Sequence, residues 1–245
     1  MAQKFALNLQ QQAPLISTGF LYRLTVIVAV LAVMTVGISI AGRWFGQRIS
    51  LAGHTNSTEI VAVTVGQDLL HLPANTIRFA RQRVSGPAER IDLYLTWPDL
   101  QGYSDENRRR FNDISSSTSL MFLQVSQSTM SRDMSGRLEP IYAHLFQGKP
   151  QPGPHGLTIH RFKPETGYGS EVVLTAPRPG QSDYVVRCLM PATGDAATSG
   201  DCQRDIHIGR DLTVLYRFSS ALLGDWSHID AEIGRFVERS LSGSN

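Results

Sequence analysis

The hydrophobic pattern is dominated by one uncharged stretch near the amino terminus, LTVIVAVLAVMTVGISIAG at 24–42. As an α-helix this stretch is roughly 28 Å long, which is close to the thickness of a bilayer's hydrocarbon core. Tyr22 precedes it, and Trp44 and Phe45 follow it, at positions where amphipathic rings settle at the level of the lipid headgroups. The pattern predicts a transmembrane helix over 24–42, with a short tail at 1–23.

Two other interpretations of this stretch are a cleaved signal peptide and a buried helix of a soluble protein. Residues 39–41 resemble a signal cleavage site, but the leader at 1–23 is long for a signal peptide. We therefore expect an uncleaved anchor. Gly37 and Ala41 lie about one turn apart and are candidates for close helix–helix packing in the membrane. Because small residues are common in any membrane helix, the absence of dimerisation is the alternative.

After a polar linker at 43–58, the pattern changes to short segments that are rich in β-branched residues or that alternate between apolar and polar positions. At 91–97, for example, Ile91, Leu93 and Leu95 fall on one face, which is typical of a strand with one solvated side. The predicted strands are 59–65, 69–72, 75–80, 91–97, 119–127, 157–162, 171–176, 183–189 and 212–218.

Helical periodicity occurs in two places. Apolar residues recur at helical spacing over 130–146, although Pro140 would kink a continuous helix there. The second helix has an apolar stripe through Leu222, Ile229 and Phe236, and Ser219 or Ser220 can cap its start. The sum predicts an α+β fold: one N-terminal transmembrane helix, then a mainly antiparallel sheet domain over 59–245 with one or two packed helices.

A Pro- and Gly-containing stretch at 148–156 is the best candidate for an internal boundary or a long loop within that domain.

The distribution of charge separates the ends of the chain. Lys4, Arg23, Arg43 and Arg48 are the only charged residues before Glu59, and the remainder of the chain is nearly neutral. A nucleic-acid-binding domain needs an excess of basic residues to neutralise phosphates, so no nucleic-acid partner is expected.

Cys188 and Cys202 are the only cysteines, and the residues between them are typical of a turn. In an oxidising compartment they would form a disulfide, and closing a loop of this length stabilises the fold by roughly 3 kcal/mol in the chain-entropy model. Two unrelated buried thiols are the alternative. A disulfide favours a domain outside the cytoplasm, and hence a cytoplasmic amino terminus, because such bonds persist there.

No sequence motif indicates catalysis, a metal site or a cofactor. His155 and His160 flank a turn, but no further ligand completes a metal site. Asp225, His228 and Asp230 crowd the last predicted helix, where helix capping and surface charge explain them better than acid–base chemistry.

The candidate partner-binding residues lie in and after a predicted loop that follows the strand at 91–97. Trp, Tyr and Arg dominate the energetic centres of protein interfaces, and loops on a rigid sheet often carry such contacts. The candidates are Trp97, Tyr103, Arg108, Arg109, Arg110 and Phe111. The alternative is that Trp97 fills the core while the arginines pair with Asp105, Glu106 or lipid headgroups.

Three segments carry a resemblance to known proteins: LPANTIRF at 72–79, RIDLYLTWPDLQGYS at 90–104 and LTVLYRF at 212–218. In these segments the chain resembles single-pass, membrane-anchored envelope proteins of Gram-negative bacteria. The resemblance implies a protein of the inner membrane whose bulk faces the periplasm, and it assigns no functional residue.

We therefore expect a membrane-tethered periplasmic binding or accessory protein of a cell-envelope complex, without catalysis of its own. Its expected partners are the lipid bilayer and an envelope protein or a second copy of the chain. One alternative is an envelope enzyme, such as a hydrolase, with a site assembled from distant residues. Another is a subunit that relays a signal through its helix.

Overall fold

The computed structural model describes residues 18–50, 53–113, 115–192 and 195–241. The chain divides into two compact units, Met1–Ala52 and Gly53–Asn245. The first contains helix α1 (Thr18–Ser50), which extends beyond the predicted span at both ends and through the first half of the predicted linker. Its part Gly19–Ile40 is long and apolar enough to be a membrane anchor or a signal sequence.

Polar side chains within α1 satisfy themselves locally. The hydroxyls of Thr25 and Thr35 donate to the carbonyl oxygens of Leu21 and Leu31, one turn earlier. This lowers the cost of placing threonine in hydrocarbon, where no water is present to accept the bond. Of the two candidate packing residues, Gly37 lies on α1 with its surface exposed, and the side chain of Ala41 lies outside the described residues.

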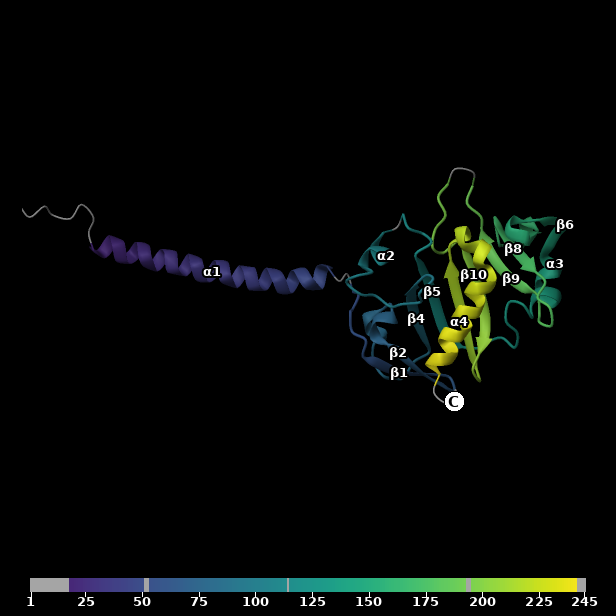
Figure 1. The fold of residues 1–245 in the computed structure, drawn as a ribbon, viewed down its shortest axis with the longest axis horizontal. Helices are drawn as coiled ribbons and strands as arrows, with labels where there is room; N and C mark the ends of the chain where they lie inside the picture. The colour runs from purple at the N-terminus through teal and green to yellow at the C-terminus, as the bar shows by residue number, and fades with distance from the viewer. Residues whose placement is uncertain (1–17, 51–52, 114, 193–194, 242–245) are drawn as a thin grey trace, which may run out of the picture. The chain divides into compact units, whose positions relative to one another are not determined.

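The second unit is built around an antiparallel eight-stranded sheet with the order β4-β5-β11-β10-β9-β8-β7-β6 (Figure 1). Its strands are β4 (Arg90–Thr96), β5 (Leu120–Gln127), β6 (Phe146–Pro152), β7 (Thr158–Phe162), β8 (Glu171–Ala176), β9 (Tyr184–Leu189), β10 (Cys202–Ile208) and β11 (Leu212–Phe218). A smaller sheet has the order β2-β1-β3 and consists of β1 (Ile60–Val65), β2 (Asp68–Pro73) and β3 (Gly86–Pro87).

The helical elements of this unit are mostly single turns: η1 (Ala74–Thr76), η2 (Ala80–Gln82), α2 (Arg108–Asn112), η3 (Leu138–Tyr142), α3 (Ala143–Leu145), η4 (Pro154–Gly156), η5 (Pro164–Thr166) and η6 (Ser220–Asp225). The longest is α4 (Trp226–Ser240), and the Ser219 side chain caps the η6 turn before it by accepting from the Ala221 amide. The α+β prediction is confirmed. The Pro- and Gly-containing stretch at 148–156 forms most of β6 and the turn η4, inside the same compact unit.

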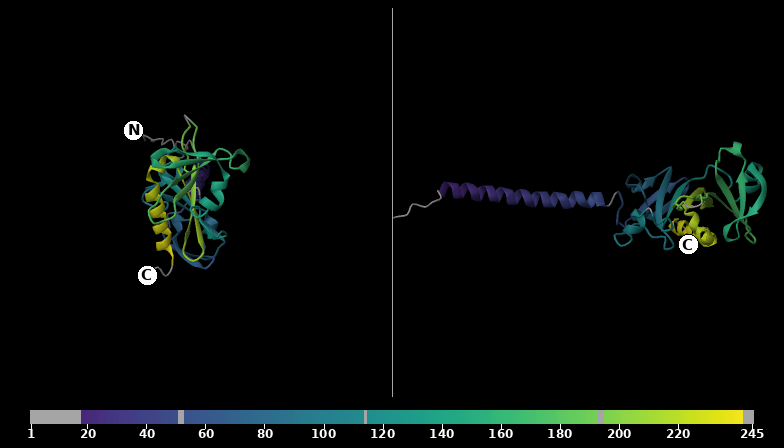
Figure 2. Two further views of the ribbon diagram at one scale, coloured as in Figure 1. Left: turned by 90° about the vertical axis from the view of Figure 1, so that its right-hand side faces the viewer. Right: turned by 90° about the horizontal axis from the view of Figure 1, so that it is seen from above.

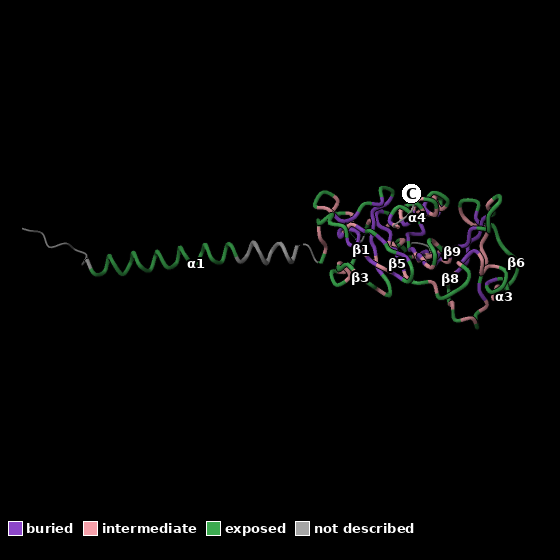
Figure 3. The backbone as a smooth tube through the Cα atoms, turned by 90° about the horizontal axis from the view of Figure 1, so that it is seen from below, coloured by how far each residue is buried: buried purple, intermediate pink, exposed green. Residues whose placement is uncertain are grey.

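The main core lies on one face of the large sheet, under α4 and the small sheet. Figure 2 shows α4 against one side of the sheet, and it contacts β10 and β2. Its apolar stripe, Ile229, Ile233 and Val237, is fully buried. Figure 3 shows that burial is concentrated in the central strands, whereas the edge strand β6 is largely exposed.

A second, smaller cluster lies on the opposite face of the sheet. It joins Val173 of β8, Val185 of β9 and Phe162 of β7 to Tyr142 of η3 and Met134. This cluster covers the β7–β9 half of that face. The other half of that face is formed by β4, β5, β11 and β10. Hydrophobic residues cover it less completely, and it contains hollows that are open to solvent.

A buried ion pair fastens α4 to the sheet. Arg204 of β10 is 1% exposed, and its Nε lies 2.8 Å from Oδ1 of Asp230 in α4. The same carboxylate accepts from the Tyr216 hydroxyl at 2.7 Å and from Arg178 at 2.8 Å. The remaining Arg204 donors reach Ser135 Oγ and the Val185 carbonyl. Burial alone would raise the pKa of Asp230, but the Arg204 guanidinium holds that pKa below its ordinary value.

This network corrects the interpretation of Asp230 as surface charge. Neighbouring Asp225 and His228 are half exposed and contact each other, as that interpretation expects, but Asp230 points into the core. The strand β10 was not predicted, because Arg204 and Asp205 interrupt its apolar pattern and both charges are neutralised only by residues distant in sequence.

Two other predicted elements are wrong. The strand at 75–80 is instead the pair of turns η1 and η2, because Asn75 is buried and exchanges hydrogen bonds with Tyr103. A Cβ at Gly102 would lie 2.7 Å from Asn75, so only glycine permits this close approach. The helix at 130–146 is reduced to η3 and α3, with Pro140 inside the η3 turn.

The cysteine pair forms the predicted disulfide. Cys188 of β9 and Cys202 of β10 are register partners, and both side chains are buried. The bond therefore joins two neighbouring strands across the base of the loop between them.

An aromatic cluster packs around His54, close to the start of the second unit. The His54 ring stacks on Tyr103 at 4.5 Å and on Tyr94 at 5.4 Å, and its Nδ1 lies 2.9 Å from the Tyr94 hydroxyl. Phe111 meets all three rings edge-on. Burial lowers the pKa of His54 below its ordinary value of 6.5.

Replacing Asp230 with alanine is expected to destabilise the second unit by about 3–5 kcal/mol, because Arg204 would remain buried without its counter-ion. Urea unfolding of the full chain in detergent micelles, followed by tryptophan fluorescence, measures this loss. The control is Glu238→Ala at an exposed position of the same helix, for which we expect a change below about 0.5 kcal/mol. Equal losses in the two variants would contradict the role of the ion pair.

Acidification is expected to weaken the fold through His54. Because its folded pKa lies below 6.5, the unfolded chain binds the proton first, so stability decreases as pH falls from 6.5 toward the lower folded value. The urea concentration at the unfolding midpoint should decrease when the pH is lowered from about 7.5 to about 5.5, and it should decrease less in His54→Gln. The exposed His144→Gln is the control, and an unchanged pH dependence in His54→Gln would refute the assignment.

Candidate binding groove

The half-open face of the large sheet presents rows of side chains that the strand register aligns. Phe122 of β5 lies opposite Tyr94 of β4 and Arg217 of β11. In the next row, Gln124 of β5 lies opposite Leu215 of β11. Asp92 of β4 and Asp205 of β10 belong to the same row, because Asp92 pairs with Gln124 and Asp205 pairs with Leu215. The last row consists of Ser126, Thr213 and His207. These side chains project to the face opposite α4 because they alternate with buried core residues such as Leu123 and Val214.

Three adjoining hollows form a groove along this face, which we call the sheet-face groove. The first holds about 80 Å³ between Arg78, Phe122 and Arg217, and the second about 170 Å³ over the middle of the sheet. They share Gln124 and Leu215. The third holds about 470 Å³ and shares Thr129, Met130 and Arg137 with the second. Each hollow shares lining residues with the next, so the groove consists of three successive hollows from β4 across β5 and β11 to the segment at 129–141.

One end of the groove is cationic and aromatic. The Arg78 guanidinium lies 4.8 Å from the centre of the Phe122 ring and 5.1 Å from that of Phe79. Arg217 is exposed on the strand beside Phe122. Within the described part of the chain, neither Arg78 nor Arg217 forms an ion pair, whereas the neighbouring Asp92 carboxylate is held by Arg90 at 3.2 Å.

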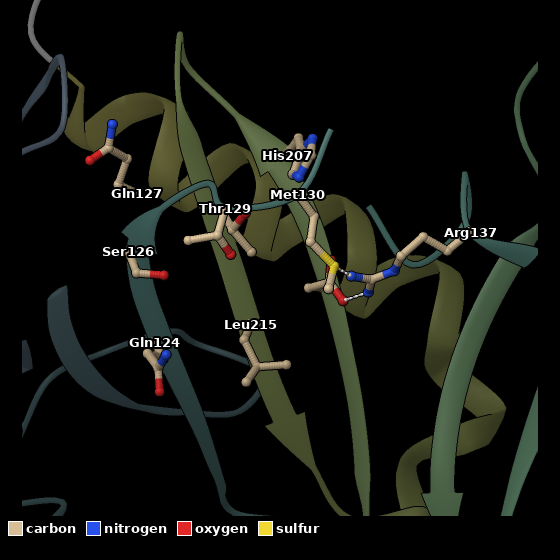
Figure 4. Close-up of a pocket in the computed structure, with 10 residues that line it drawn as sticks. Gln124, Ser126, Gln127, Thr129, Met130, Arg137, His207 and Leu215 are labelled. Carbon is tan, nitrogen blue, oxygen red and sulfur yellow. Dashed lines mark hydrogen bonds and ion pairs between the residues drawn. The ribbon is translucent and has the colours of Figure 1, made fainter. Parts of the chain in front are cut away.

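The middle of the groove is polar, as Figure 4 shows. Arg137 forms an ion pair with Asp205 and donates to the Met130 sulfur at 2.7 Å. His207 Nε2 lies 3.1 Å from the Ser128 hydroxyl. These contacts fix the segment after β5 against β10, and so build the wall between the second and third hollows.

The far end of the groove combines an apolar patch with polar residues, among them Ser131 and Arg132. Pro140, Ile141 and Met130 line the third hollow, and the side chains of Met130 and Ile141 are 54% and 42% exposed. Large apolar side chains left in water beside a polar groove are typical of interaction surfaces.

The structure places the six candidate partner-binding residues elsewhere, and largely in the interior. Trp97 and Tyr103 are buried, and Phe111 is partly buried in the His54 cluster. Arg110 pairs with Asp99 at 2.7 Å and donates to the Trp97 carbonyl, which holds the loop in place. Trp97, Tyr103, Arg110 and Phe111 therefore lie close together, and their contacts stabilise the fold.

Only Arg108 and Arg109 of the six are exposed, on the single turn α2. Partner binding by these two arginines stays a prediction.

The groove residues escaped sequence analysis because they come from four separated segments. Phe122 and Arg217 occupy the polar register of predicted strands, and an aromatic residue in that register is the one sequence signal that could have indicated them. No group of three or more His, Cys, Asp or Glu side chains is arranged to hold a metal ion within the described ranges.

No family model matches this sequence, and no curated protein is significantly similar to it. Two solved structures resemble its fold. One is Smlt3025, an immunity protein of the Stenotrophomonas maltophilia type IV secretion system, with 16% identity and a TM-score of 0.53 over 78% of this chain and 96% of that chain. The other is the Neisseria meningitidis iron-regulated outer membrane lipoprotein FrpD, with 12% identity and a TM-score of 0.48 over the same shares. The likeness to Smlt3025 shows a shared fold, and the weaker one to FrpD carries no argument.

Proposed function

We propose that the chain is a membrane-tethered binding or accessory protein of the bacterial cell envelope, anchored in the inner membrane with its folded unit in the periplasm and without catalysis of its own. The observation that carries the proposal is the sheet-face groove. It extends along the large sheet, with Arg78 and Arg217 at one end and exposed Met130 and Ile141 at the other. Neither arginine forms an ion pair with another described residue. These side-chain types are enriched at protein interfaces.

Two further features support the proposed location in the cell envelope. Helix α1 contains a segment long and apolar enough to span a bilayer, and a disulfide such as Cys188–Cys202 is typical of proteins that fold in an oxidising compartment. The fold that the chain shares with an immunity protein of a secretion system agrees with an accessory role in the envelope.

The contact between Ser128 and His207 is the observation that favours the second candidate, an envelope hydrolase. A serine nucleophile must donate its hydroxyl hydrogen to the histidine that acts as the base. Here the Ser128 hydroxyl donates to the Met130 carbonyl at 2.7 Å, so its oxygen is left to accept from His207. The nearby Asp205 carboxylate is occupied by Arg137. This geometry favours binding over catalysis.

A photo-crosslinking amino acid at Gln124, in the middle of the groove, is expected to form an adduct with an envelope protein in living cells. The full-length chain carries the probe at its native expression level, and irradiated membranes are resolved by mass. The control places the same probe at Glu238, exposed on α4. Adducts of equal yield and identity at both positions, or none at Gln124, would contradict binding through the groove.

The hydrolase candidate has a separate test. Purified full-length protein treated with a fluorophosphonate probe should remain unlabelled, because the Ser128 hydrogen is directed to a carbonyl oxygen. Stoichiometric labelling that disappears in Ser128→Ala would establish an activated serine and replace the binding proposal.

A further inference from the structure

We infer that the sheet-face groove takes a protein segment of mixed chemistry, with a carboxylate side chain between Arg78 and Arg217 and an apolar side chain against Met130 and Ile141. The inference rests on the proposed function and adds the chemistry of the partner.

The balance of charge identifies the acidic end. Three arginines on the strands or rim of this face have a carboxylate partner: Arg90 with Asp92, Arg137 with Asp205, and Arg187 with Glu171. Arg132, at the third hollow, stands alone and forms no ion pair with the described residues. In the described portion, Arg78 and Arg217 have none. Two positive charges that line one hollow without a counter-ion favour an anionic group there.

The geometry of Arg78 suits a carboxylate. Its guanidinium rests against Phe122 and Phe79, and these ring contacts hold the plane without using its N–H groups. The N–H edge is therefore available for the paired hydrogen bonds that guanidinium groups make to carboxylates. The hollow of about 80 Å³ exceeds the ~10–15 Å³ that one water needs, and is smaller than the ~150 Å³ cavity known to hold benzene. It has room for a carboxylate.

The rest of the groove argues against a polyanion. Asp92 lines the same hollow as Arg78 and Arg217, and Asp205 lines the next one, but each carboxylate is already neutralised by its own arginine. A nucleic acid or a continuous sheet of anionic headgroups would gain nothing from these paired sites. A single acidic side chain fits the charge pattern better, because only the hollow between Arg78 and Arg217 brings together two positive charges without an ion pair among the described residues.

The third hollow specifies the other end of the segment. Its volume of about 470 Å³ and its Met130, Pro140 and Ile141 lining suit a branched or aromatic side chain. Methionine adapts its shape to such partners. Between the two ends, Gln124 and Thr213 offer hydrogen bonds to the backbone of the bound segment.

The test extends the crosslink at Gln124 in the full-length, membrane-bound chain. Mass spectrometry of the adduct identifies the crosslinked segment, and the double variant Arg78→Glu/Arg217→Glu is compared with Arg235→Glu/Arg239→Glu, which makes the same charge change on exposed positions of α4. We expect the groove variant to lose at least about tenfold in adduct yield and the α4 variant to keep it. Exchanging the acidic residue of the captured segment for arginine should restore the yield with the groove variant.

The outcomes distinguish failure of the proposed function from failure of this inference alone. Absence of an adduct at Gln124 would overturn both the proposed function and this inference. An adduct that survives the double substitution, lacks an acidic residue near the crosslink, or joins lipid or a second copy of this chain would overturn the inference alone. Thermal unfolding of both double variants, expected within a few degrees of the parent, excludes misfolding as the cause of a loss. Ile141→Asp provides a second reading, since it should reduce the yield through the apolar end only.

Discussion

The buried pair between Arg204 and Asp230 is the contact on which the arrangement of the folded unit depends. A charge at the centre of a sheet is tolerated only if it is paired and fully hydrogen-bonded, and here the pair also ties α4 to β10. α4 and the small sheet cover one face of the large sheet, and the second cluster around Val173 and Val185 covers only half of the other face. The sheet-face groove is what remains. Its existence follows from how few elements a chain of this size supplies to an eight-stranded sheet.

Much of the scaffold follows from local patterns, whereas the parts that depend on long-range contacts do not. Strand β11 has the alternation of a half-buried strand, whereas β8 is a short apolar run rich in β-branched residues; the bounds of both agree with the prediction. Strand β10 has no such pattern, because Arg204 and Asp205 are buried by partners on α4 and at residue 137. The turn at Asn75 is determined by its contact with the loop at Gly102. Neither contact is visible in a window of neighbouring residues.

The candidate site shows the same division. Tryptophan, tyrosine and arginine are enriched at interfaces. Here Trp97 and Tyr103 are buried, and Arg110 holds the loop through Asp99 and the Trp97 carbonyl. The groove instead combines Arg78, Gln124 and Leu215, which are far apart in sequence and become neighbours only through strand pairing. Composition names residue types that are common at interfaces, whereas the register of the sheet decides which side chains are exposed.

The central claim is that a tethered, periplasmic unit presents this groove to a protein partner. Labelling of single engineered cysteines by a membrane-impermeant maleimide tests it most directly, at Thr213 in the groove and at Glu238 on α4, in spheroplasts and in the purified chain. The account predicts that both positions react without lysis, and that the rate at 213 relative to 238 is lower in spheroplasts than in the purified chain. Labelling only after lysis, or an identical ratio in both preparations, would contradict it.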